Sequence, residues 1–165
     1  MSEELRERLE LIVMDLDAHP LESHASRIAE LVQAHPHSIA QQKSDHSIES
    51  YNCVIHALGL RGKMAEFQYP LLFAGTALVN HLIGQELEQC DPRPDAVVAW
   101  SSEGVLRHVG KLIATDRVES KWGLGHLWAH GLDELPLRYG DVTGFYAPIE
   151  PEVILVELRK IVASL

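Results

Sequence analysis

A cysteine and a histidine 55 positions apart carry the most informative chemical pattern in this chain. Cys53 follows Asn52, a residue type that often caps helices, so we expect the thiol in the first turn of a short helix. The free N–H groups and the dipole at a helix start favour a thiolate. His108 lies inside a predicted strand, where β-propensity does not favour a histidine. Together they predict a cysteine nucleophile with a histidine base.

The elements that position these two residues follow from hydrophobic spacing. Helical periodicity predicts helices over residues 3–17, from Ser23 to residue 34, at 53–58, over Leu71–Leu87 after Pro70, and from Pro151 to the end. Strands are expected at 96–100, 106–114, 118–123 and 142–146, with loops at 37–50 and 131–141. Helices followed by a small antiparallel sheet and a closing helix form an α+β pattern with segregated layers.

Three segments in this order resemble the NlpC-type branch of the papain-like cysteine peptidase and amidase superfamily. They are Tyr51-Asn-Cys53 opening a helix, Pro94-Asp-Ala-Val-Val-Ala-Trp100 as a first strand, and His108-Val-Gly110 opening the next strand. Ser120-Lys-Trp-Gly123, followed by His130 and Tyr139-Gly140, resembles a less characterised bacterial group with this fold. The resemblance spans residues 50–146. It implies a papain-like (NlpC-type) fold and thiol protease or amidase chemistry.

The same resemblance implies a polar side chain that orients the histidine, about a dozen residues further along the chain. This offset falls on Ser120, where the superfamily carries His, Asn, Gln, Asp or Glu. Glu119 is the alternative, because a one-residue change of hairpin register decides which side chain points toward His108. His130 is a third possibility. His56 lies three residues after Cys53 on one helix face and competes with His108 as the base.

Two functions follow from this pattern. The first is a cysteine-dependent amide hydrolase or transferase of the peptidase, amidase or deamidase type, acting on a peptide or protein. In it Cys53 attacks a carbonyl, His108 moves the proton, and the Cys53 N–H contributes to the oxyanion hole. The alternative is a catalytically inactive interaction or regulatory module. The apolar Leu71–Leu87 helix is then a face for a second copy or another protein.

Composition excludes several other classes of function. The 165 residues carry a net charge of −10, which disfavours nucleic acid as a partner. Residues 1–50 hold ten acidic and four basic side chains. We find no secretion signal and no apolar run long enough to span a bilayer, so we expect a cytoplasmic protein without a membrane partner. Delivery as an effector by a dedicated secretion machine fits the same pattern.

The remaining cysteines and histidines predict no metal or other cofactor. Two cysteines, Cys53 and Cys90, are too few for a disulfide framework or a four-thiolate zinc site. His126 and His130 have the spacing of a helical metal site, but the glycines around them favour a loop. Five further histidines near predicted loops are expected at the surface: His19, His24, His35, His37 and His46. The tryptophans, at positions 100, 122 and 128, are expected in the core or as walls of a cleft.

We expect one domain over residues 1–165, since a chain of this length buries enough surface to be stable without cross-links. Within it, residues 1–45 form a helical N-terminal extension, residues 46–148 the papain-like core, and residues 149–165 the C-terminal helix.

Overall fold

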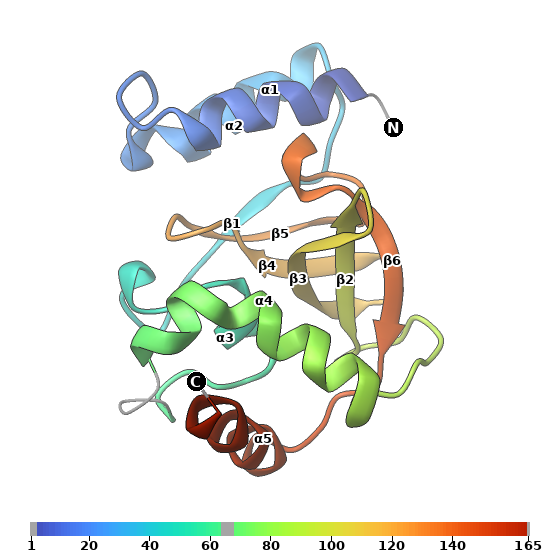
Figure 1. The fold of residues 1–165 in the computed structure, drawn as a ribbon. Helices are drawn as coiled ribbons and strands as arrows, with labels where there is room; N and C mark the ends of the chain where they lie inside the picture. Colours follow the sequence, from blue (N-terminus) through green and yellow to red (C-terminus); the bar gives the residue numbers. More distant parts are fainter. Residues whose placement is uncertain (1–2, 64–67, 165) are drawn as a thin grey trace.

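Helices flank the two sides of one sheet in the computed structural model, which describes residues 3–63 and 68–164 and leaves the side chains of 68–74 and 162 outside the description (Figure 1). The helices are α1 (Glu3–Met14), α2 (His24–Glu30), α3 (Cys53–Ala57), α4 (Gln68–Gln85) and α5 (Pro151–Ala163). The strands are β1 (Ala40–Gln42), β2 (Val97–Ser102), β3 (Val105–Ala114), β4 (Arg117–Lys121), β5 (Leu127–Gly131) and β6 (Asp141–Tyr146). A short 3-10 turn, η4 (Leu137–Tyr139), precedes β6.

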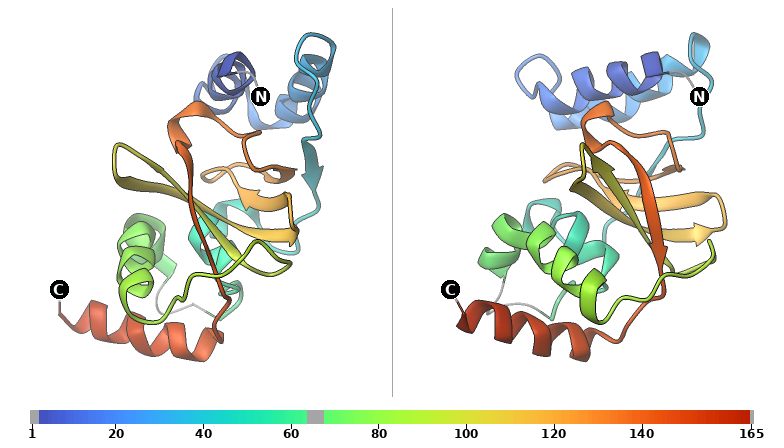
Figure 2. Two further views of the ribbon diagram at one scale, coloured as in Figure 1. Left: turned by 90° about the vertical axis from the view of Figure 1, so that its right-hand side faces the viewer. Right: turned by 45° about the vertical axis from the view of Figure 1, so that its right-hand side comes forward.

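The sheet has the strand order β1-β5-β4-β3-β2-β6, and every neighbouring pair is antiparallel. Helices α1 and α2 lie on one side of it, and α3, α4 and α5 lie on the other (Figures 1 and 2). The register of β2 shifts against both of its neighbours beside Trp100. The molecule is therefore α+β, with one open antiparallel sheet between two helical layers.

Two hydrophobic clusters fill the two sides of the sheet, as the side-chain alternation of strands requires. Val97 and Ala99 of β2 belong to the cluster under α3 and α4, which we call the helix-side cluster. Val98 and Trp100 belong to the arm-side cluster, which is closed by Leu5, Leu9, Ile12 and Ile28 of α1 and α2. Each cluster thus brings together residues that lie far apart in the sequence.

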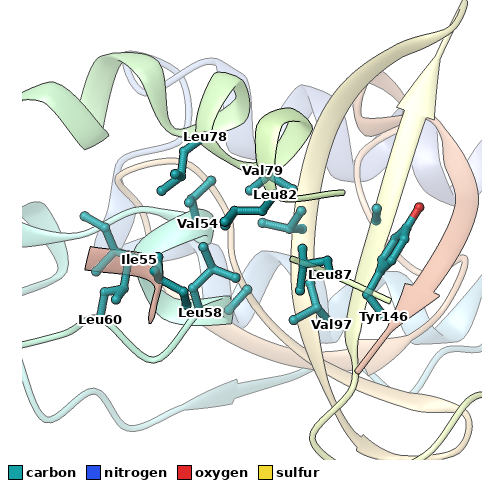
Figure 3. Packing of buried hydrophobic residues seen from close by; sticks show 14 of the residues in the cluster. Val54, Ile55, Leu58, Leu60, Leu78, Val79, Leu82, Leu87, Val97 and Tyr146 are labelled. Atoms are coloured by element: carbon teal, nitrogen blue, oxygen red, sulfur yellow. The ribbon is translucent and has the colours of Figure 1, made fainter. Parts of the chain in front are cut away.

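Close packing between α3 and α4 forms the middle of the helix-side cluster. Val54, Ile55 and Leu58 meet Leu78 and Leu82 there (Figure 3). At Gly75 of α4 a Cβ atom would lie 2.9 Å from Val54 Cγ2, so a glycine permits this approach.

The predicted apolar face of residues 71–87 is buried, as far as its side chains are described, against the chain itself. Leu78, Leu82 and Leu87 are 1, 0 and 5 % exposed. The Leu71, Phe73 and Ala74 side chains lie outside the described residues. The helix begins at Gln68, earlier than predicted, which puts Pro70 in the first turn, where a missing N–H is tolerated.

Two strands differ from the prediction. β1 lies within the polar segment 37–50, and β5 lies between glycines that favoured a loop, so that His130 stands on a strand. β1 and β5 pair with one another, and β5 also pairs with β4, so long-range pairing overrides the local turn signals. Helix α1 ends at Met14 rather than residue 17, because Asp15 Oδ1 accepts from the Ala18 N–H at 3.1 Å and forms a turn.

None of the described helices combines the length and the apolar character that crossing a lipid bilayer requires.

Candidate functional site

Cys53 is the first residue of α3, as the sequence predicts. Asn52 Oδ1 accepts from the Ile55 N–H at 3.0 Å, which confirms the helix cap. Cys53 is half-buried against the helix-side cluster, where α3 packs on β3 and β4. Burial raises the pKa of the thiol, while backbone amides, that of Val109 first among them, favour the thiolate and offset part of the rise. The resting sulfur is therefore protonated at neutral pH.

A buried lysine fixes the segment that leads into this helix. Lys121 Nζ donates to the carbonyl oxygens of Ile48, Tyr51 and Gly123 at 2.5, 2.9 and 3.1 Å. It also lies 4.6 Å from the centre of the Tyr51 ring. Burial lowers the pKa of Lys121 to about 8, with the nearby Cys53 acting in the opposite direction. Sequence reasoning missed this residue, although a lysine beside Trp122 in a predicted strand is a signal for it.

His108 lies in β3 and is 1 % exposed. Its ring stacks on Tyr139, with centroids 4.0 Å apart and planes 16° apart, and Trp100 lies at 5.3 Å. Neither ring nitrogen has a hydrogen-bond partner among the described residues. Burial holds the pKa of His108 well below its usual value, and the neighbouring His130 and His56 lower it further. The imidazole is therefore neutral at physiological pH.

Cys53 and His108 lie on different sides of the sheet, and no hydrogen bond joins them among the described contacts. His108 packs with arm-side residues, whereas Cys53 belongs to the helix-side cluster. Val109, the residue after His108, presents its backbone amide to the sulfur. Burial is the main cause that raises the pKa of Tyr139, and the nearby Cys53 is the next. The sulfur thus lies within electrostatic reach of the ring that covers His108.

Ser120 contacts His130 rather than His108. Its Oγ lies 2.7 Å from His130 Nε2, and His130 Nδ1 lies 2.6 Å from the carbonyl oxygen of Gly131. Since a carbonyl only accepts, Nδ1 carries the proton and the Ser120 hydroxyl donates to Nε2. The Trp122 indole N–H donates to Ser120 Oγ at 3.2 Å. The register of the hairpin explains this choice, because Ser120 lies beside Gly110, two residues along β3 from His108.

Glu119 contacts the other histidine weighed as a base. Its Oε1 lies 3.1 Å from His56 Nε2, on the helix side of the sheet. The interaction with His56 is the main cause that lowers the pKa of Glu119. The two candidates for the orienting residue therefore point to opposite sides of β4, and each meets a different histidine.

Other site expectations have mixed outcomes. Trp100, Trp122 and Trp128 are all buried core residues. His24 was expected at the surface, but it is 2 % exposed, because α2 packs it against the hairpin that carries His126. Within the described ranges, no group of three or more His, Cys, Asp or Glu side chains is arranged to hold a metal ion.

This geometry defines an α+β protein that has a buried histidine in its sheet and a cysteine at the start of a helix. The chain belongs to a family described as a domain of unknown function (DUF7689), whose model matches residues 42–147. That range contains Cys53, His108, Ser120 and Glu119, and it omits α1, α2 and α5. Comparison with curated proteins and with solved structures gives no match.

Proposed function

We propose that this protein is a cysteine-dependent amide hydrolase or transferase with Cys53 as the nucleophile and His108 as the base. The observation that carries the proposal is the state of His108. A buried imidazole without a hydrogen-bond partner costs the fold about 1–3 kcal/mol, so a neutral acceptor kept there is best explained by a proton that it receives during a reaction. The residue next to it presents its amide to the Cys53 sulfur.

The proposed reaction begins from a neutral thiol and a neutral imidazole. The sulfur attacks the carbonyl carbon of an amide while His108 takes the thiol proton, and the C–N bond breaks as His108 returns that proton to the leaving amine. Water or another nucleophile then cleaves the thioester. Burial disfavours a resting ion pair, so proton transfer accompanies the attack.

The proposal includes a papain-like arrangement of residues 46–148 and a peptide or protein substrate in the cytoplasm. A cysteine helix packed on an antiparallel sheet that carries the histidine supports this arrangement. The partners of Ser120 and Glu119 leave the orienting role to Tyr139, whose stacked ring restricts the His108 imidazole.

A second candidate, a non-catalytic interaction or regulatory module, has two observations in its favour. Cys53 and His108 pack on different sides of the sheet, with no hydrogen bond between them among the described contacts. Burial raises the pKa of Cys53, whereas an independently activated nucleophile has a lowered pKa. In this case the partner surface includes the described outer faces of the helices rather than Leu78 and Leu82, which the chain itself buries.

Alkylation of Cys53 by iodoacetamide distinguishes the two candidates. The experiment uses a Cys90→Ser background, so that a single thiol reacts. If His108 is the base, the rate is nearly constant between pH 6.5 and 8, because the imidazole stays neutral throughout this range. A thiol that acts alone reacts about tenfold faster for each unit of pH below its raised pKa.

The variants His108→Ala and His56→Ala identify the base. We expect His108→Ala to lower the alkylation rate at pH 7 about a hundredfold and to restore the tenfold dependence per pH unit. His56→Ala is the matched control and should retain the flat profile. Should His56→Ala alone abolish the flat profile, the base is His56 with Glu119. A steep profile in the parent protein contradicts the hydrolase proposal and supports the non-catalytic module.

A further inference from the structure

Lys121 carries a positive charge inside the protein without an acidic partner. It is 0 % exposed, and among the described residues no carboxylate forms an ion pair with it. The three ammonium hydrogens are donated instead to the carbonyl oxygens of Ile48, Tyr51 and Gly123. Lysine is seldom fully buried without a paired acid, because removing a charge from water is costly. The carbonyl dipoles solvate the ammonium group but do not cancel its charge, so this charge acts on groups nearby.

The start of α3 lies against this ammonium group. Glu119 and Lys121 are two positions apart on β4, so their side chains point to the same side of the sheet, where Glu119 meets His56 of α3. Tyr51, whose carbonyl oxygen is 2.9 Å from Lys121 Nζ, comes two residues before Cys53. Because α3 packs on β4, the sulfur and the ammonium group share one side of the sheet.

The charged and titratable groups around Lys121 differ in how water screens them. Glu49 and Cys53 both favour the charged form of Lys121. The Tyr51 ring lies 4.6 Å from Nζ, and Arg61 contacts the same ring at 5.3 Å. Glu49 is exposed, so water screens its charge, whereas Cys53 is half-buried. Among the charged side chains of the described residues, Lys121 is the one that lowers the pKa of Cys53.

We propose that Lys121 is a positioning residue that holds the start of α3 and stabilises the negative charge formed on the Cys53 sulfur when the thiol loses its proton. This role rests on the proposed function only in taking Cys53 as the nucleophile, and it is the same whether His108 or His56 receives the proton. Lys121 transfers no proton itself, because carbonyl oxygens hold its three hydrogens. The sulfur loses its charge again as its bond to the substrate carbon forms, so Lys121 speeds the attack.

Alkylation of Cys53 in the Cys90→Ser background measures the effect of this charge. Lys121→Gln removes the charge and keeps two N–H donors for the carbonyl oxygens, so we expect the rate with iodoacetamide at pH 7 to fall about tenfold. The difference should disappear by pH 9.5, because burial lowers the pKa of Lys121 to about 8 and the parent protein then loses the charge. A purely structural role predicts the opposite result, since a loosened α3 exposes the half-buried thiol and raises the rate at every pH.

Lys111→Gln is the matched control for the change of net charge. Lys111 stands opposite Glu119 on the neighbouring strand β3, and its ammonium group lies 3.6 Å from the Asp95 carboxylate. It is not among the groups that act on the Cys53 sulfur. The alkylation rate of this variant should therefore stay within about twofold of the parent rate.

A measurement on the parent protein gives a second test that needs no change at Lys121. Iodoacetate is negatively charged and iodoacetamide is neutral, so a cation beside the sulfur favours iodoacetate. We expect the ratio of the two alkylation rates, iodoacetate over iodoacetamide, to fall several-fold between pH 7 and pH 9.5 as Lys121 loses its proton.

Three results would overturn the proposal. They are a Lys121→Gln rate at pH 7 that equals or exceeds the parent rate, an equal fall of the rate in Lys111→Gln, and a ratio of iodoacetate to iodoacetamide rates that stays constant with pH. The proposed function fails separately, through a steep pH profile in the parent protein, and such a profile leaves the expected tenfold effect of Lys121→Gln unchanged.

Discussion

Two buried histidines in the arm-side layer of the sheet, His108 and His130, have opposite surroundings. His130 is 0 % exposed, and both of its ring nitrogens are hydrogen-bonded, one to Ser120 and the other to Gly131. His108 is equally buried, but it has only ring contacts with Tyr139 and Trp100. The centres of the two imidazole rings lie 5.3 and 6.1 Å from the centre of the same Trp100 ring, so the difference does not come from depth in the core.

This comparison separates a structural histidine from a candidate for chemistry. A fully partnered imidazole such as His130 fixes the sheet and has no capacity left for a substrate proton. An unpartnered imidazole such as His108 contributes little through hydrogen bonds and keeps both nitrogens available. Substitution of the two residues should therefore affect different properties.

The largest expected effect is on stability at His130. His130→Ala removes two buried hydrogen bonds and leaves a cavity, so we expect the free energy of unfolding to fall by about 3–4 kcal/mol. Urea denaturation at pH 7.5 measures this, with the exposed His46→Ala as the control. A loss below about 1 kcal/mol would mean that the Ser120–His130 network does not stabilise the sheet.

A smaller effect is expected from pH. Burial lowers the pKa of His130 to about 4, whereas the unfolded value is 6.5. The unfolded chain therefore binds more protons between these values, and stability falls as pH falls through this window. We expect about 2 kcal/mol less stability at pH 5 than at pH 7.5 from His130, with His108 adding to the loss in the same direction.

Urea denaturation at several pH values tests this, and His130→Ala should show a reduced pH dependence. If the wild-type and variant slopes are equal, His130 is not the group responsible.

The smallest effect on stability is expected at His108. His108→Phe keeps a ring against Tyr139 and removes two unpartnered nitrogens, so the free energy of unfolding should be unchanged or higher by up to about 1 kcal/mol. The same variant should lose the flat pH profile of Cys53 alkylation. A destabilisation above about 2 kcal/mol, measured by urea denaturation, would show that His108 is a structural residue like His130.

Sequence patterns predicted most of the helices and strands that have clear local signals. Helix α3 with its Asn52 cap, the strands from residue 97 to 121, and the C-terminal helix all follow from local periodicity and capping. They did not predict β1 or β5, since the glycines around His126 and the polar residues near Gln41 are local signals that long-range pairing overrides.

Sequence patterns predicted the residues of the candidate site better than the contacts that these residues make. The position of Cys53 at a helix start and the position of His108 in a strand could be anticipated, because each depends on a single element. The partners of Ser120 and Glu119 depend on the β3–β4 register and on β5, which no local pattern specifies. The triple contact of Lys121 depends on a loop of irregular structure and could not be predicted in the same way.

The two N-terminal helices determine whether the residues matched by the family model can fold as an independent unit. Residues 42–147 do not include Leu5, Leu9, Ile12 and Ile28, which close one side of the sheet. Arg6 joins this layer to the rest by hydrogen bonds to the carbonyl oxygens of Leu135 and Gly140. In a fragment cut to the family range, this side of the sheet would therefore be exposed to water, and its apolar side chains would promote aggregation. Expression trials and domain grafts should carry these helices along.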